Sequence, residues 1–137
     1  MTPFNNFTIK AQEALKKAHD LAIERSHQQI TPLHILSALI LQEEGTVDQV
    51  LERLGLDVAA LADKLLEVLD RQPRISGGNG IASLYLSQDL GRVMEQAHRE
   101  ASQLKDEFIS VEHLFLAILA VPSPARDLLL EHGVAHE

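Results

Sequence analysis

The chain has 137 residues and a formal net charge of −8, from 12 Lys and Arg against 20 Asp and Glu. This length fits one domain, which at this size buries roughly two-thirds of its unfolded-chain surface and folds without a metal or a crosslink. The absence of cysteine excludes disulfides, zinc knuckles and thiol nucleophiles. The acidic balance argues against nucleic-acid binding, which needs clustered Lys and Arg.

Targeting and membrane segments are not expected either. Residues 1–4 carry no basic region followed by an apolar stretch, so they do not form a secretory signal. The longest apolar run, 114–121, is far shorter than the ~20 residues that a membrane span needs. We therefore expect a cytoplasmic protein that does not contact a membrane.

Two helices are predicted in the first forty residues. After Thr8, a suitable N-cap, apolar residues recur at helical spacing from 11 to 22 and form one amphipathic stripe. Thr31 and Pro32 then supply an N-cap and a proline at the first helical position. The helix that follows, 33 to about 44, is apolar around most of its girth, so we expect it to be central and buried.

A short third and a longer fourth helix are predicted next. The pair Gly45-Thr46 is expected to end the second helix and to cap the third, which Gly55 stops. Asp57 is expected to cap the fourth helix, which spans 58–70.

The residues from 71 to 86 form the connection between the two halves of the chain. Pro73 and three glycines between 77 and 80 are typical of a loop. The end of this connection, 81–86, is too apolar for a free linker and is expected to lie on the surface of the fold. Three further helices are then predicted, with caps at Ser87, Ser110 and Ser123 and a stop at Gly133.

The second half of the chain repeats the first. The dipeptide Ala18-His19 recurs as Ala97-His98, a shift of 97 − 18 = 79 residues. The same shift relates caps, apolar stripes and further identities: Thr8 to Ser87, Leu15 to Met94, Ala22 to Ala101, Ile30 to Ile109, Thr31 to Ser110, His34 to His113 and Ala38 to Ala117. We therefore predict one all-α domain over 1–137, with tandem repeats over 8–70 and 87–137 packed as one pseudo-two-fold bundle.

The second repeat is expected to be truncated. The counterpart of the fourth helix, 58–70, would begin near Ala135, and the sequence ends at Glu137. The chain is therefore expected to be a fragment of a longer protein, in which an eighth helix covers apolar surface of the second repeat.

Catalytic and metal chemistry are not expected. His19, His34, His98 and His113 lie at repeat-equivalent positions, and shared packing explains this pairing without a metal site, which needs three or four converging ligands. The sequence has no G-x-S-x-G nucleophile elbow and no G-x-x-x-x-G-K-[ST] phosphate loop. We predict a binding module that is not an enzyme and holds no cofactor.

Two carboxylates leave two interpretations open. Asp106 and Glu112 flank the short connection 108–110 that leads into the buried sixth helix. In the structural interpretation, Glu112 stabilises the positive end of that helix and Asp106 lies in a turn. In the functional interpretation, the two carboxylates form a polar rim beside an apolar groove between the repeats.

The chain resembles the Clp N-terminal repeat, the two-copy domain at the front of Clp/Hsp100 AAA+ unfoldases. Four segments carry the resemblance: FTIKAQEAL at 7–15, HQQI at 27–30, YLSQDL at 85–90 and FISVEHL at 108–114. They are most similar to the ClpB-type disaggregases, with the ClpC and ClpA types as close relatives. The resemblance covers essentially the whole chain. It implies a full-length homohexamer whose remaining modules bind ATP, whereas this fragment is expected to be monomeric.

The resemblance also implies a binding site for unfolded or aggregated client polypeptides. Family positions tied to this role match Thr8, Asp106 and Glu112. The groove wall is expected from the fifth helix and the strip before it, with Leu86, Leu90 and Met94. Met is flexible, and a shallow apolar groove with an acidic rim suits weak binding without sequence readout.

Two alternatives within the family remain. One is the ClpC-type domain, for which the resemblance implies phosphoarginine binding through a Glu that precedes the His in both repeats. Here the second repeat has Glu112-His113, but the first has Leu33-His34, which favours the disaggregase interpretation. The other alternative is a surface that docks a folded adaptor of a Clp protease.

Overall fold

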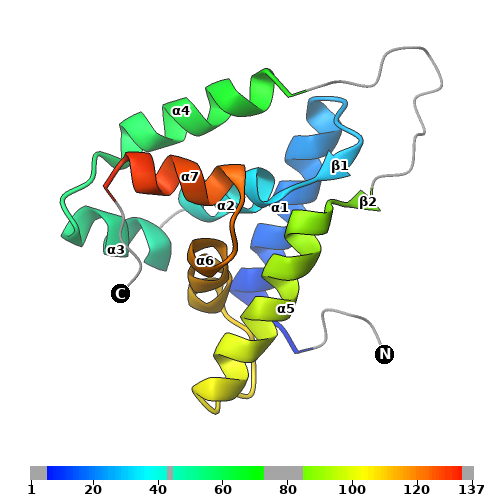
Figure 1. The fold of residues 1–137 in the computed structure, drawn as a ribbon, viewed down its shortest axis with the longest axis vertical. Helices are drawn as coiled ribbons and strands as arrows, with labels where there is room; N and C mark the ends of the chain where they lie inside the picture. Colours follow the sequence, from blue (N-terminus) through cyan, green and yellow to red (C-terminus); the bar gives the residue numbers. More distant parts are fainter. Residues whose placement is uncertain (1–5, 43–44, 73–84, 134–137) are drawn as a thin grey trace.

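The computed structural model describes residues 6–42, 45–72 and 85–133. The elements follow in the order α1 (Ile9–Glu24), β1 (Gln29–Ile30), α2 (Pro32–Leu41), α3 (Thr46–Arg53), α4 (Val58–Asp70), β2 (Tyr85–Leu86), α5 (Gln88–Gln103), α6 (Val111–Ala120) and α7 (Pro124–Glu131) (Figure 1). The prediction of an all-α fold is confirmed, with the addition of two two-residue strands, β1 and β2. The apolar residues before the fifth helix form β2.

The two repeats have matching elements. A shift of 79 residues carries the bounds of α1 onto those of α5 and the bounds of α2 onto those of α6. After the loss of one residue, α3 matches α7, and the glycines that follow these helices, Gly55 and Gly133, both have positive φ, at 85° and 97°. The tandem repeat predicted from the sequence is therefore present in the structure.

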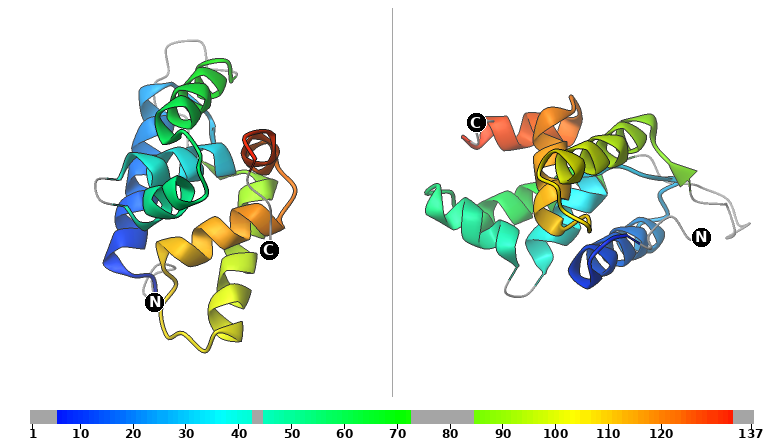
Figure 2. Two further views of the ribbon diagram at one scale, coloured as in Figure 1. Left: turned by 90° about the vertical axis from the view of Figure 1, so that its left-hand side faces the viewer. Right: turned by 90° about the horizontal axis from the view of Figure 1, so that it is seen from below.

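The core lies between the two apolar helices, one from each repeat. In α2 and α6 nearly every residue is buried, including Leu36, Leu39, Leu114 and Ile118. The repeat symmetry extends to the contacts between units, because α2 packs on α7 as α6 packs on α3. Helices α1 and α5 lie on one side of this central pair, and α3, α4 and α7 lie on the other (Figures 1 and 2).

In each repeat, the residues before the first helix pair with a segment of the other repeat. β2 pairs in parallel with β1, with Leu86 opposite Ile30. At the equivalent place Phe7 forms a parallel bridge with Ile109. The backbone amides one residue on, at Ser87 and Thr8, donate to the carbonyls of Ile30 and Ile109 at 3.0 and 2.9 Å. This reciprocal exchange joins the two repeats into one domain.

Most predicted helix caps are present, and one boundary differs. Asp57 and Ser123 accept hydrogen bonds from the amides of Ala60 and Arg126, as N-caps do. Of the predicted pair Gly45-Thr46, Gly45 takes the N-cap position of the third helix and Thr46 begins it. The second helix, however, ends at Leu41 and not near residue 44. Most of the predicted connection 71–86 lies outside the described residues.

Within the described ranges, no single helix is both long and apolar enough to cross a membrane. Only α6 and α7 taken together reach the required length and apolarity, and they are bent by 89° relative to each other.

Candidate functional site

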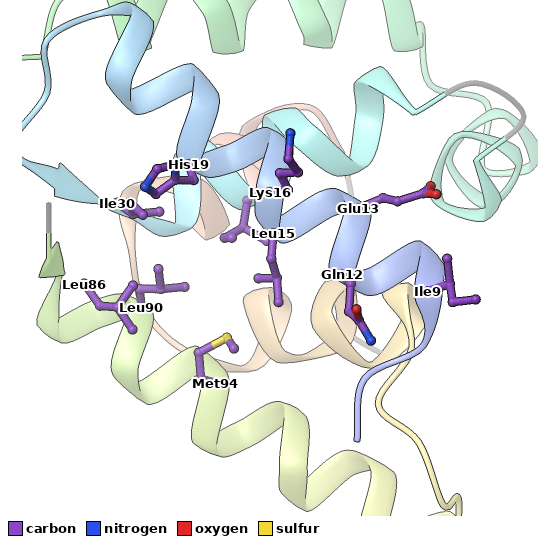
Figure 3. A pocket seen from close by; sticks show the side chains of 11 residues that line it. Ile9, Gln12, Glu13, Leu15, Lys16, His19, Ile30, Leu86, Leu90 and Met94 are labelled. Atoms are coloured by element: carbon purple, nitrogen blue, oxygen red, sulfur yellow. The ribbon is translucent and has the colours of Figure 1, made fainter. Parts of the chain in front are cut away.

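An apolar cavity of about 580 Å³ lies between the two helices that begin the repeats. α1 contributes one wall and α5, with β2, contributes the opposite wall (Figure 3). The cavity is open to the surface. Its lining is formed by Ile9, Gln12, Glu13, Leu15, Lys16, His19, Ile30, Ile35, Leu86, Leu90 and Met94.

The cavity contains the three apolar residues predicted for the groove wall. Leu86 is 53% exposed at the rim, and Met94 is half-buried. Leu90 is only 1% exposed, so it belongs to the core and forms the floor of the cavity. The structure thus brings Leu86, Leu90 and Met94 together; their role in client binding stays a prediction.

The opposite wall of the cavity, on α1, was not predicted from the sequence. Leu15 is the repeat equivalent of Met94, and both are half-buried beside the core. The equivalence of Leu15 and Met94 could have predicted this wall, because a groove near the pseudo-two-fold axis must be lined by both members of such a pair. The α1 side of the cavity carries one amide, one acidic and one basic side chain, from Gln12, Glu13 and Lys16 respectively.

The other three predicted site residues do not line this cavity. Thr8 caps α1, since its hydroxyl accepts a hydrogen bond from the Ala11 amide at 3.1 Å. Glu112 is exposed in the first turn of α6. Asp106 precedes the same helix. The polar residues that line this cavity come from α1 and include neither Asp106 nor Glu112, whose role in client binding stays a prediction.

Asp106 has a structural partner inside the second repeat. The Nδ1 atom of His113 accepts a hydrogen bond from the Ser110 amide at 2.8 Å, which closes a capping box at the start of α6. Because Nδ1 is an acceptor, Nε2 carries the proton, and it donates to the Asp106 carboxylate at 2.8 Å. This hydrogen bond ties Asp106 to α6 and fixes the connection before that helix.

The first repeat uses a histidine where the second uses Asp106. His34 accepts a hydrogen bond from the Thr31 amide at 2.9 Å through Nδ1, and its Nε2 atom contacts Nδ1 of His27 at 2.8 Å. Burial, and in smaller measure the neighbouring charges of His27 and Arg25, lower the pKa of His34 from its ordinary value of 6.5 to about 4. The predicted structural role of His34 and His113 is confirmed by these capping boxes.

Among the described residues, no group of three or more His, Asp or Glu side chains is arranged to hold a metal ion. The chemistry that the site offers is burial of apolar surface, with a few polar atoms at one side.

Three comparisons place this arrangement among known proteins. The model of the Clp repeat (R) N-terminal domain matches residues 6–132. Chaperone protein ClpB of Bacteroides thetaiotaomicron is 36% identical over 137 residues, which cover 98% of this chain and 15% of that protein. The Hsp104 N-terminal domain from Candida albicans has the same fold, with a TM-score of 0.84, 23% identity and coverage of 96% of this chain and 85% of that one. A complex of the ClpV N-domain with a VipB peptide has a TM-score of 0.74 at 23% identity and covers 97% and 81% of the two chains.

The fold and the cavity define a helical double-repeat domain with an apolar site at the junction of its repeats. The chain belongs to the Clp repeat N-terminal domain family. It corresponds to the N-terminal domain of the ClpB chaperones and spans about 15% of the length of the curated relatives it matches.

Proposed function

We propose that the cavity between α1 and α5 captures exposed apolar segments of unfolded or aggregated polypeptides. In the full-length protein, a hexamer whose other modules bind ATP, the captured segment passes to the ATPase rings for threading. The observation that carries this proposal is an open apolar cavity of about 580 Å³ with exposed Leu86 at its rim and half-buried Met94 inside. Apolar cavities of this size bind apolar ligand groups.

The composition of the cavity suits weak and unselective capture. Leu86 and Met94 can adjust their rotamers to different side chains, and Met adapts especially well. Polar groups with a fixed hydrogen-bonding geometry, which would select one sequence, are few and lie on the α1 side. A client held in this way dissociates readily, as transfer to a translocating ring requires.

Thr8, Asp106 and Glu112 enter this proposal indirectly. Thr8 and Asp106 hold the starts of α1 and α6 through hydrogen bonds to Ala11 and His113. Glu112 remains exposed and is free to meet a basic residue of a client outside the cavity.

Docking of a defined partner segment is the second candidate. It is favoured by the ClpV N-domain, a neighbour in fold that forms a complex with a VipB peptide. Phosphoarginine recognition is less well supported, because Leu33, which stands where the first repeat would need an acid, is 2% exposed and part of the core.

The proposal is tested by a single substitution at the rim. Leu86→Ser should weaken binding of unfolded casein by about tenfold, since loss of one partly buried Leu costs about 1.4 kcal/mol. Stability should change by less than about 0.5 kcal/mol, because Leu86 is exposed in the free domain. Fluorescence titration and thermal melts measure the two effects.

Leu104→Ser is the matched control. Leu104 is 59% exposed, follows α5 and does not line the cavity. It should leave casein affinity unchanged. Equal losses in both variants would contradict the proposed site, and tight binding of a folded adaptor without casein binding would support the second candidate.

A further inference from the structure

The pseudo-two-fold symmetry puts Leu86 and Phe7 in equivalent positions. Each residue directly precedes the N-cap of the first helix of its repeat, and each pairs in parallel with an isoleucine, Ile30 or Ile109. Their environments differ sharply, because Phe7 is 3% exposed and Leu86 is 53% exposed.

The ring of Phe7 packs against a histidine. Phe7 and His98 form an edge-to-face pair with centroids 6.0 Å apart and an interplanar angle of 83°. The repeat equivalent of His98 is His19, which lines the cavity together with Ile30 and Leu86 (Figure 3). The cavity therefore begins at the place where the other half of the domain holds a phenyl ring.

At the floor, the half that contains the cavity has the larger side chain of the two. Ala11 is the equivalent of Leu90, so the larger Leu90 takes part of the room that the ring of Phe7 occupies in the other half. The exchange nevertheless leaves the cavity open beside His19.

We infer that the His19 end of the cavity takes an aromatic side chain of the bound polypeptide, in the position that Phe7 occupies in the other half. This inference rests on the proposed function and names the residue class that the site prefers. An aromatic ring supplies a large apolar area at low conformational cost, and it meets the edge or face of an imidazole favourably. Lys16 and Glu13 at the α1 side have opposite charges, so a neutral ring is accepted without a compensating charge.

Three labelled peptides of equal length test the inference. They share a Ser/Gly frame with two valines and carry Phe, cyclohexylalanine or Leu at the central position. The Phe peptide should bind the domain about two- to tenfold more tightly than the other two, which is the range that aromatic pairing contributes beyond area. His19→Ala should lower the affinity for the Phe peptide more than that for the Leu peptide, so that the ratio of the two affinities falls toward one.

Leu86→Phe tests the same idea from within the chain. A ring at this position should fill the cavity as Phe7 fills its own half, so affinity for the Phe peptide should fall at least tenfold while the melting temperature is kept or raised. Leu86→Ala is the matched control, because it leaves the cavity open and should keep the preference for Phe.

The outcomes separate this inference from the proposed function. Equal affinities of the Phe and Leu peptides, or tighter peptide binding by Leu86→Phe, would overturn the aromatic preference and leave client capture standing. If neither the peptides nor unfolded casein bind the unsubstituted domain, both fail. Should Leu86→Phe not fold, the peptide series and His19→Ala still decide.

Discussion

His34 and His113 hold the same position in two equivalent helices but have different partners. Both accept a backbone hydrogen bond through Nδ1 and so complete a capping box. The Nε2 atom then contacts His27 in the first repeat and Asp106 in the second, two residues that are themselves related by the 79-residue shift. Protonation of His34 at Nδ1 would replace an acceptor by a donor and break the hydrogen bond from the Thr31 amide.

The fold should therefore lose stability as the pH falls from about 6.5 to about 4. The folded pKa of His34, about 4, lies below its ordinary value of 6.5, so the unfolded state binds more protons in this interval and stability rises with pH. His34→Gln should flatten this dependence, since Gln at the third helical position also completes a capping box. Between pH 7.5 and pH 5, the parent should lose roughly 2 kcal/mol of stability more than the variant. Urea unfolding at pH 7.5 and pH 5 measures it.

Two comparisons isolate the effect. Asp48 contributes with the opposite sign, because burial, and then the nearby Glu52, raise its pKa to about 6; this contribution cancels when parent and variant are subtracted. His19→Gln, at a half-exposed side chain, is the control and should behave as the parent does. A pH dependence in His34→Gln as steep as that of the parent would show that the buried histidine pair is not its source.

At the scale of elements, the ends of α1 and α5 share a strained residue. Ser26 and Lys105 are equivalent positions, and both adopt the left-handed conformation, with φ of 56° and 59°. For a residue with a Cβ atom this conformation costs about 1–2 kcal/mol. The left-handed conformation turns the chain after the helix, toward His27 in the first repeat and toward Asp106 in the second.

Glycine at this position should stabilise the domain. Lys105→Gly removes the left-handed strain but adds about 0.5–1 kcal/mol of unfolded-state entropy, so we expect a net gain of about 0.5 kcal/mol. Lys105→Ala, the control, should show no gain because alanine keeps the Cβ atom. Urea midpoints measure the changes, and a loss of stability in the glycine variant equal to that in the alanine variant would contradict this account of the turn.

The helices and their caps were largely predictable because their signals are local. Thr8, Asp57, Ser87 and Ser110 were predicted as N-caps, and each lies one residue before a helix and accepts an amide hydrogen bond from its first turn. The end of α2 was placed too late, since residues 42–44 are good helix formers and no helix breaker occurs before Gly45, but the backbone of Gln42 is extended. Local pattern determines where a helix begins more firmly than where it ends.

At the scale of the whole molecule, the repeat was predictable and the cavity only in part. Matching caps and stripes predict two similar units, and the groove residues Leu86 and Met94 do lie together. The second wall, on α1, depends on how the two units pack, which no local signal of either unit encodes. The same holds for the strand exchange that joins Phe7 to Ile109 and Leu86 to Ile30.

The central claim is that unfolded polypeptides bind between α1 and α5, and methyl NMR of the domain during titration with unfolded casein tests it most directly. We predict that the methyl signals of Leu15, Leu86 and Met94 shift together and saturate at one client concentration. Signals of Leu54, the C-cap of α3, and Leu130 on α7, which are exposed and lie outside the cavity lining, should stay unchanged. Shifts confined to those residues, with the cavity methyls unaffected, would contradict the account.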